Sequence, residues 1–207
     1  MPPKVKFTKE ELIETALEIV REKGIDGVTA REIAARKGAS TQPVFSCFSS
    51  MDEVKREVRA KAEKIYESYV LGGLKEKVPF FGFGMAYIRF AKDEPELYRL
   101  LFFGSPERGD IGATETMKCV SETLVPMLEK IYNITEPQAD RLYRDMWLVV
   151  HGLASLIVAG CCPYSDAEIG KILTGFSISV CKAIKEIPGF TDGTFDRDEV
   201  FEKLVKE

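Results

Sequence analysis

Five capping boxes, each a Ser or Thr followed three residues later by Glu or Gln, constrain the fold of this chain more than any other feature of its sequence. In such a box, each of the two side chains accepts a hydrogen bond from a backbone N–H that the start of a helix leaves without a partner. The boxes are Thr8/Glu11, Thr29/Glu32, Ser50/Glu53, Thr135/Gln138 and Ser165/Glu168. Three are flanked by the apolar pairs of a hydrophobic staple, which are Phe7/Leu12, Val28/Ile33 and Tyr164/Ile169. Together they predict a mainly helical chain.

The stop signals support an all-α fold. Gly24 and Gly38 each follow an apolar stripe, and the basic pair Arg36-Lys37 before Gly38 suits a helix C-terminus. Long alternation of apolar and polar residues is lacking, and there is no Asn-Gly hairpin turn. The predicted helices cover residues 8–23, 30–37, 41–47, 51–71, 80–93, 95–103, 111–132, 136–161, 166–186 and 197–206.

Composition excludes several classes of protein. With 207 residues, 45% hydrophobic and 30% charged, the chain has the balance of a globular protein of one domain or two small ones. A net charge of −4 argues against coating nucleic acid by bulk charge but permits a local basic face. One histidine and five cysteines without a C-x-x-C pair argue against a zinc site, and we expect neither metal nor cofactor.

The N-terminal segment and the longest apolar run bear on location. The start, MPPKVKFTKEE, lacks the apolar stretch and cleavage site of a signal peptide. The run from Met146 to Cys162 is 17 residues long and contains His151. A bilayer-spanning helix needs about 20 residues, so a buried helix is the better interpretation. We therefore expect a cytoplasmic protein with reduced cysteines.

The segments 30–37 and 41–47 have the form of a helix-turn-helix unit. They are short and are joined by the tight turn Lys37-Gly38-Ala39-Ser40. Helical spacing directs Val44 and Phe48 inward and leaves the opposite surface polar and small. That surface consists of Thr41, Gln42, Phe45 and Ser46, with Pro43 in the first turn. Such side chains suit base edges and thymine methyl groups in the major groove.

Basic residues near this unit are candidates for phosphate contacts. Residues 1–60 contain 11 Lys and Arg against 10 Asp and Glu, whereas residues 61–207 contain 18 against 23. The candidates are Lys4, Lys6, Arg31, Lys55 and Arg56. Neutralising phosphates with such groups would make binding weaken as salt rises. The alternative is an ordinary solvated helical surface.

Residues 7–58 resemble the TetR family of bacterial transcriptional regulators. The matching residues are Phe7-Thr8, Ala16, Gly24-x-x-Gly27-Val28-Thr29, Ile33-Ala34, Gly38-Ala39-Ser40, Val44-Phe45-x-x-Phe48 and Ser50-Met51-Asp52-Glu53-Val54. The resemblance implies a three-helix DNA-binding domain joined by a long helix to a helical ligand-binding and dimerisation domain, which we assign to residues 1–55 and 56–207. It also implies that Thr29, Arg31, Thr41, Gln42, Pro43 and Phe45 face DNA. With the residues chosen above, the predicted DNA-binding set is Lys4, Lys6, Thr29, Arg31, Ser40, Thr41, Gln42, Pro43, Phe45, Ser46 and Lys55.

This chain departs from the family pattern at three positions. The family usually has Tyr where this chain has Phe45, often His in place of Cys47, and commonly Lys in place of Met51. The Tyr hydroxyl and the Lys typically touch phosphates in the family. Their loss puts those phosphate contacts in question and suggests that Lys55 takes over the work.

Aromatic residues crowd into residues 80–103, which hold 8 of the chain's 21. Core packing of two helices is one explanation, and a greasy ligand pocket is the other. Trp147-x-x-x-His151-Gly152 resembles a W…H-G signature of one TetR subgroup, although a buried, hydrogen-bonded imidazole is the plainer interpretation of His151. The predicted ligand-binding residues are Tyr87, Phe90, Phe102, Phe103, Met117, Tyr143, Trp147 and His151.

Small residues on the last two long helices permit close helix approach. The family arrangement uses this pair from each subunit to form a four-helix dimer interface. The predicted interface residues are Gly152, Ser155, Ala159, Leu173, Phe176 and Val180. A hairpin that packs only within its own chain is the alternative. A homodimer is favoured because readers of the groove that use one short helix usually need two half-sites.

These features predict a ligand-responsive regulator, more specifically a repressor that binds a palindromic operator as a homodimer and is released by a small, mostly apolar effector. A small all-α enzyme is the first alternative, and we do not expect one because the chain has no G-x-S-x-G, P-loop or G-x-G-x-x-G motif. The second alternative is a DNA-binding regulator without an effector, either constitutive or redox-sensing through Cys161-Cys162 or Cys47.

Overall fold

The computed structural model describes residues 7–104 and 113–206, and every regular element within them is a helix. The predicted all-α class is therefore confirmed. The helices are α1 (Lys9–Lys23), the 3₁₀ turn η1 (Ile25–Gly27), α2 (Ala30–Arg36), α3 (Gln42–Cys47), α4 (Met51–Gly73), α5 (Pro79–Asp93), α6 (Pro95–Phe102), α7 (Ala113–Tyr132), α8 (Glu136–Val158), α9 (Asp166–Glu186) and α10 (Arg197–Lys206). The first two residues of the predicted helix 111–132 lie outside the described residues.

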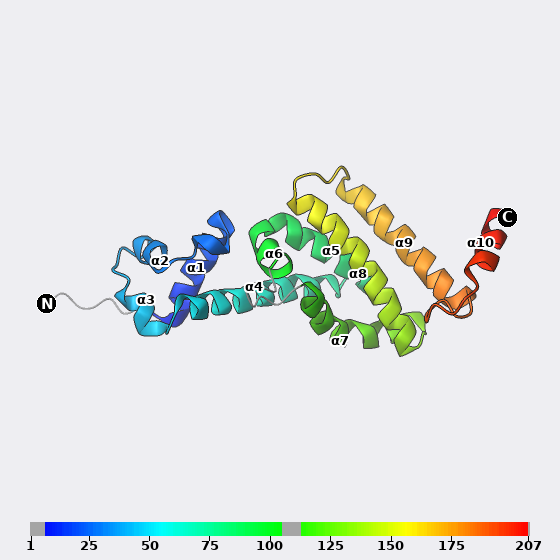
Figure 1. Ribbon diagram of the computed structural model, residues 1–207, viewed down its shortest axis with the longest axis horizontal. Coiled ribbons are helices and arrows are strands. Elements are labelled where there is room, and N and C mark those ends of the chain that lie inside the picture. The colour runs from blue at the N-terminus through cyan, green and yellow to red at the C-terminus, as the bar shows by residue number, and fades with distance from the viewer. Residues whose placement is uncertain (1–6, 105–112, 207) are drawn as a thin grey trace.

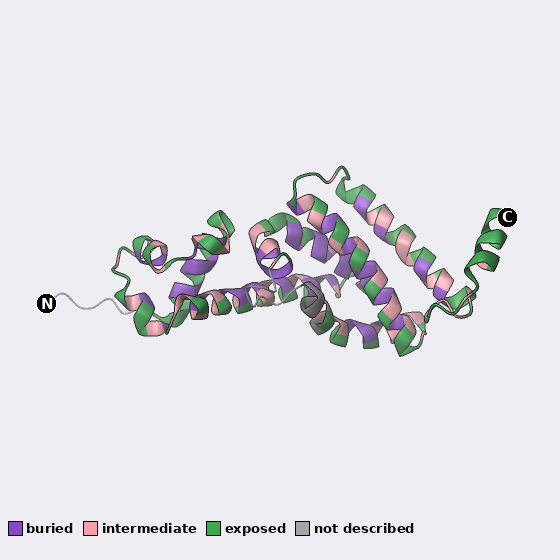
Figure 2. Cartoon of the chain, in the orientation of Figure 1, coloured by how far each residue is buried: buried purple, intermediate pink, exposed green. Residues whose placement is uncertain are grey.

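The helices form two groups that α4 connects (Figure 1). Helices α1 to α3 lie at one end, and α4 runs without a break from them to the larger body made by α5 to α9. Helices α8 and α9 lie side by side and run in opposite directions, while α10 lies at the end remote from α3. Buried residues follow the inward faces of α1, α4, α5 and α8, so one core extends along the connecting helix (Figure 2).

The helix starts use the predicted caps in two ways. Thr8 and Ser165 form complete boxes, in which Glu11 and Glu168 reach back to the backbone N–H of the cap at 2.8 Å. Gln138 also reaches back, to the N–H of Thr135 at 2.9 Å. At Thr29 and Ser50 only the cap hydroxyl bonds forward. There the third residue of the helix has ionic partners instead, because Glu32 contacts Lys23 and Arg36, and Glu53 contacts Lys9.

Two glycines in the left-handed region end helices. At Gly38, with φ of 60°, the N–H of Ala39 bonds to the carbonyl of Ala34 and reverses the chain between α2 and α3. At Gly160, with φ of 72°, the N–H of Cys161 bonds to the carbonyl of Leu156. The helix predicted to reach residue 161 therefore ends at Val158. Gly160 causes this earlier end, and it escapes notice in the sequence because it lies within an apolar run.

Polar contacts hold the first group of helices against the body. Arg21 of α1 makes a two-point ion pair with Glu94 at the α5–α6 corner, with N–O distances of 2.8 and 2.6 Å. Arg59 of α4 is buried and donates to the carbonyls of Leu100 and Leu101 at the end of α6. These contacts set the orientation of α1 to α3 relative to the body.

Candidate DNA-binding surface and effector cavity

The short helix α3 presents a polar surface outward and an apolar surface inward. Val44 and Phe48 are buried in the core, whereas Thr41, Gln42 and Ser46 are exposed and Phe45 is 53% exposed. The Cys47 thiol lies 3.6 Å from the carbonyl oxygen of Phe7, which fastens the inner side of α3 to the segment before α1. This orientation matches the one that helical spacing predicts.

The hydrogen-bonding groups on this surface differ in availability. The Ser46 hydroxyl donates to the carbonyl of Gln42 at 2.8 Å, so its proton is used within the helix. The Thr29 hydroxyl accepts the N–H of Glu32 at 3.1 Å and caps α2. In the described part of the chain, the Gln42 amide has no hydrogen-bond partner that would occupy it. Gln42 is therefore the side chain best placed for a two-point contact with a base.

Some cations of the N-terminal helices form ion pairs with glutamates, and others do not. Lys9, Lys23, Arg36 and Lys61 are paired with glutamates of α1, α2 and α4. Among residues 7–104 and 113–206, no carboxylate pairs with the candidate cations Arg31, Lys55 and Arg56, nor with Lys37. Lys37 lies over the Phe7 ring instead and was not among the predicted contacts. Lys4 and Lys6 lie outside the described residues.

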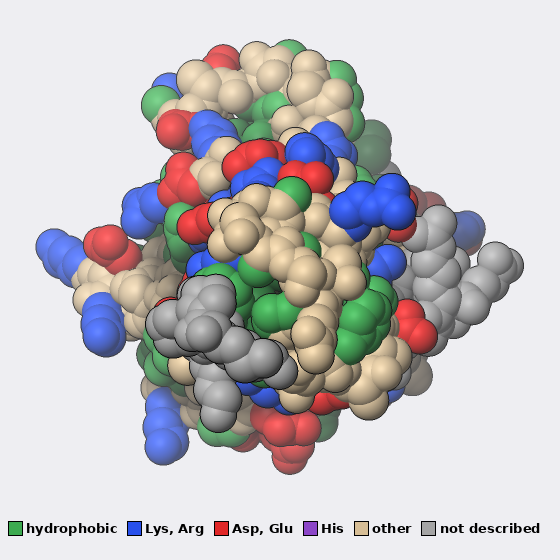
Figure 3. Space-filling model, turned by 90° about the vertical axis from the view of Figure 1, so that its left-hand side faces the viewer, with side chains coloured by type: hydrophobic (Ala, Val, Ile, Leu, Met, Phe, Trp, Pro, Cys, Tyr) green, Lys and Arg blue, Asp and Glu red, His purple; other side chains and the backbone are tan. Residues whose placement is uncertain are grey.

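The end of the molecule that carries α1 to α3 is shown in Figure 3. Lys and Arg side chains lie around its rim, interspersed with acidic ones, while the centre shows hydrophobic side chains among backbone and other uncharged side chains. Ser40 and Thr41 at the start of α3 are exposed, and Pro43 is half-buried. An uncharged centre with cations at its edge suits a groove, in which bases lie between two phosphate backbones.

The aromatic cluster predicted to bind a ligand is closely packed. Tyr87, Phe90 and Tyr143 are completely buried, and the rings of Trp147 and His151 stack with their centroids 4.6 Å apart. Phe102 is buried, Met117 is half-buried and its carbonyl accepts the Tyr143 hydroxyl at 3.0 Å, and Phe103 is exposed. The sequence correctly places these side chains near one another, but neither of the two described cavities is lined by any of them. Spacing along a helix predicts a shared face without showing whether neighbouring rings fill the space.

His151 is the polar centre of this cluster. Its Nδ1 atom lies 2.9 Å from the hydroxyl oxygens of both Tyr87 and Tyr98. Burial lowers the pKa of His151, and burial raises the pKa of both tyrosines, so all three groups are neutral near pH 7. The Trp147 indole N–H is buried without a partner in the described part of the chain.

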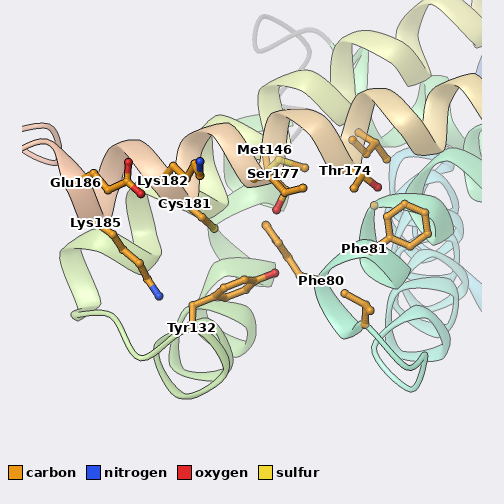
Figure 4. A pocket seen from close by; sticks show the side chains of 14 residues that line it. Phe80, Phe81, Tyr132, Met146, Thr174, Ser177, Cys181, Lys182, Lys185 and Glu186 are labelled. Carbon is orange, nitrogen blue, oxygen red and sulfur yellow. The ribbon is translucent and has the colours of Figure 1, made fainter. Parts of the chain in front are cut away.

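A cavity of about 490 Å³ lies instead between α5, the end of α7, α8 and α9 (Figure 4). Its walls are mostly apolar, and polar and charged side chains complete the lining. The apolar residues include Val78, Phe80, Phe81, Met146, Leu173 and Ile178. Thr174, Ser177 and Cys181 are polar, and Lys182, Lys185 and Glu186 are charged. A pocket of this size and character suits a small organic molecule.

Comparison with known proteins decides the family. The model of bacterial regulatory proteins of the tetR family matches residues 12–58, and the model described as Tetracyclin repressor-like, C-terminal domain matches residues 80–171. The chain belongs to the TetR family. TetR-family proteins are transcriptional regulators, so this chain is a DNA-binding regulator and not an enzyme. The helix-turn-helix of α2 and α3 lies inside the first matched segment, and α5, α6 and α8 lie inside the second.

Solved structures share the fold of this TetR-family chain at low sequence identity. A transcriptional regulator from Rhodococcus sp. RHA1 is 17% identical, with a TM-score of 0.58, and the match covers 85% of this chain and 96% of that one. A protein of unknown function from the same organism is 18% identical, with a TM-score of 0.61, and the match covers 88% and 98%. No curated protein matches the chain.

The three departures from the TetR pattern have local explanations. Phe45 is exposed but has no hydroxyl with which to reach a phosphate. Met51 is half-buried and packs against the core, and Cys47 contacts the Phe7 carbonyl. None of the three is a cation, so none of them can form an ion pair with a phosphate.

The predicted dimer residues fall on two different faces of the TetR-family helix pair α8/α9. Gly152 and Ala159 are exposed, and Ser155 and Phe176 are half-buried. Leu173 and Val180 are buried within their own chain, so they face inward and not toward a partner as predicted. The apolar stripe of α9 is occupied by the core, because α9 packs on α5 as well as on α8. Exposed Leu148 and Leu156 of α8 lie on the same side of that helix as Gly152 and Ala159.

None of the described helices is long and apolar enough to span a bilayer.

Proposed function

We propose that this protein is a cytoplasmic, effector-responsive repressor that binds a palindromic operator as a homodimer. Residues 1–55 form the DNA-binding domain in this proposal, and residues 56–207 bind the effector and the second subunit. The observation that carries it is the orientation of α3, which buries Val44 and Phe48 and exposes Thr41, Gln42 and Phe45 at one end of the molecule. One such helix reads only a few base pairs, which is why two subunits are needed.

The exposed outer face of α8 is the surface that we propose for the second subunit. It combines Leu148, which is 58% exposed, and Leu156 with the small residues Gly152 and Ala159. Apolar residues beside small ones allow two helices to approach closely and remove hydrophobic surface from water.

Release by an effector requires that the body control the orientation of α1 to α3. Three contacts supply such control, since Arg21 and Arg59 tie α1 and α4 to α6, and Arg99 of α6 donates to the carbonyl of Val158 at the end of α8 at 2.6 Å. Helix α6 therefore contacts the DNA-binding group and the proposed interface helix together. An effector that moves α6 or α5 would change the spacing of the two α3 helices.

Selection of binding sites from a random duplex library, followed by measurement of subunit mass in the complex, tests the proposal. The expected motif has two inverted half-sites whose centres are about 34–36 Å apart, or a multiple of that spacing, bound by two subunits. A motif without dyad symmetry, or a complex containing one subunit, would refute the dimer. If affinity for the selected site resists every small molecule tested, a constitutive regulator is supported; if it changes only on oxidation, a redox sensor is supported.

A further inference from the structure

We propose that the cavity between α5, α7, α8 and α9 binds an amphiphilic carboxylate, with its apolar body inside and its acid group at Lys182 and Lys185. This inference rests on the proposed function, because it names the class of effector to which the regulator responds. It also moves the effector site away from the aromatic cluster around His151. Three features carry it: the apolar walls, the charge of the mouth and the position of the cavity beside the contact between α4 and α5.

The walls favour an apolar body. Phe80, Met146 and Leu173 are buried on the side toward the core, and Phe81 and Ile178 contribute apolar surface nearer to solvent. The hydroxyl of Thr174 already donates to the carbonyl of Gly170 at 2.8 Å, and the other polar side chains of the lining are Tyr132, Ser177 and Cys181. A sugar, nucleotide or peptide would lose more hydrogen bonds to water than these few groups could replace. An alkyl or aryl group would lose none.

The mouth favours one anionic group. Lys182 and Lys185 are exposed and belong to the last turns of α9. Neither ammonium group has a carboxylate partner in the part of the chain that the structure describes, whereas Lys9, Lys92 and Lys203 do. Figure 4 shows Lys185 extending from α9 toward Tyr132, while Lys182 and Glu186 lie on the other side of the helix. The charged part of the lining therefore has two ammonium groups against one carboxylate, a net charge of one positive.

The cavity lies beside a close backbone contact between α4 and α5. Phe80, Phe81 and Gly84 of α5 line it, and Gly82 in the same turns abuts the backbone of α4. A Cβ atom on Gly82 would lie within 2.1 Å of the carbonyl oxygen of Gly73, and one on Gly73 would lie within 2.3 Å of the oxygen of Gly82. Any ligand that shifts the start of α5 must therefore shift the end of α4. Helix α4 leads to the DNA-binding group.

Calorimetric titration of the full-length protein with decanoate and with 1-decanol tests the ligand class. These two probes share a chain length but differ in charge at pH 7. We expect decanoate to bind at least tenfold more tightly than 1-decanol. Equal affinities, or no binding of either probe, would overturn the inference.

Matched lysine variants locate the acid group. Lys182→Gln combined with Lys185→Gln should weaken decanoate binding about tenfold and leave 1-decanol unchanged, as expected when about 1.4 kcal/mol of charge interaction is lost. Lys130→Gln removes one positive charge from an exposed position of α7 that does not line the cavity, and it should change neither affinity. If Lys130→Gln weakens decanoate as much as the double variant, binding depends on overall charge and the assigned site is wrong.

A filling variant locates the apolar body. Ser177→Phe places a ring in the cavity from the half-buried middle of α9 and should abolish the binding of both probes. Unchanged binding in a variant whose circular dichroism matches the parent would overturn the location. The lysine variants change exposed side chains only, so they remain informative if Ser177→Phe does not fold.

These experiments distinguish a failure of the ligand inference from a failure of the proposed regulatory function. If neither probe binds, but the protein still binds a symmetric selected operator as a dimer, the ligand inference fails and the regulator proposal stands. If decanoate binds but no sequence-specific DNA complex forms, the regulator proposal fails. If both hold, decanoate should release the operator from the parent protein, and release by the Lys182/Lys185 variant should need about tenfold more decanoate.

Discussion

Arg59 of α4 donates a hydrogen bond from Nη1 to the carbonyl oxygen of Leu100 at 2.8 Å, inside the core. Its second terminal nitrogen, Nη2, donates to the oxygen of Leu101 at 3.1 Å, and Nε lies 3.2 Å from Glu63. The last carbonyls of a helix have no partner within the helix itself. Arg59, from the half of α4 nearer to α1–α3, thus supplies the hydrogen-bond donors that the last carbonyls of α6 lack.

Replacing Arg59 by Met should destabilise the protein. Leaving the two buried carbonyls without donors costs about 1–3 kcal/mol for each group, so the free energy of unfolding should fall by about 2–6 kcal/mol. Urea unfolding followed by circular dichroism measures it. Arg59→Lys is the matched control, since it keeps one donor and should recover part of the loss. A change below about 0.5 kcal/mol in the Met variant would show that the α4–α6 contact contributes little.

Replacing Gln42 by Ala should relax sequence preference at one base pair of each half-site. Gln42 is exposed in the first turn of α3, and its amide is not engaged within the described residues. A bidentate contact contributes about 1–3 kcal/mol of discrimination, so preference at that position should fall about 10-fold to 100-fold. Binding assays on a panel of singly substituted operators measure it. An equal loss on every operator in the panel would contradict a base contact.

Replacing Arg31 by Ala should weaken DNA binding to a similar extent on every sequence. Arg31 is exposed in the first turn of α2 and has no carboxylate partner in the described part of the chain. A lost phosphate contact lowers the slope of log affinity against log salt by about 1. Titrations at several salt concentrations measure that slope. Arg36→Ala is the comparison, because Arg36 is already paired with Glu22 and Glu32 and should leave the slope unchanged.

His151 should make stability depend on pH between about 7 and 5. Burial lowers its pKa in the folded protein below the ordinary value of 6.5, so the unfolded chain takes up a proton first as pH falls. Its contribution to stability is complete above pH 6.5 and is lost as pH decreases toward the folded pKa. The lowered pKa values of Glu10, Glu22 and Glu53 act below about pH 4.5, outside this window. Urea unfolding at pH 7.5 and pH 5.5 should show the decrease.

The matched variant for this pH effect is His151→Gln. Glutamine retains a hydrogen-bond acceptor for Tyr87 or Tyr98 but does not titrate. The variant should be less stable than the parent at pH 7.5, and its stability should change little between the two pH values. An unchanged pH dependence in the variant would assign the effect to another group.

Replacing Leu148 by Glu should dissociate the proposed dimer. The side chain is exposed on the outer face of α8, and burying an unpaired carboxylate in an interface is strongly unfavourable. Sedimentation velocity at micromolar concentration should show a monomer with a normal circular dichroism spectrum. Val205→Glu makes the same kind of change at a position of α10 that is 83% exposed, and it should leave the mass unchanged. A dimeric Leu148→Glu variant would place the interface elsewhere.

The local signals in the sequence predict the helices closely. Helix α9 covers Asp166–Glu186, as predicted from the box at Ser165 and the stripe that follows it. The main error concerns the end of α8, where Gly160 adopts a left-handed conformation inside an apolar run. Caps, staples and glycines act over four or five residues, so they can be recognised in a single sequence. The turn η1 is an exception, because three residues without an apolar period leave no such pattern.

The sequence by itself determined which residues form helices and which face of α3 carries Val44 and Phe48, since both depend on neighbours three or four positions away. Only the tertiary structure decided where space remains. The rings of Tyr87 and Trp147 pack against His151, whereas Lys182 and Lys185 of α9 come to lie with Phe80 of α5 around a cavity. Packing brings together residues about a hundred positions apart, and no local periodicity encodes the volume left between them.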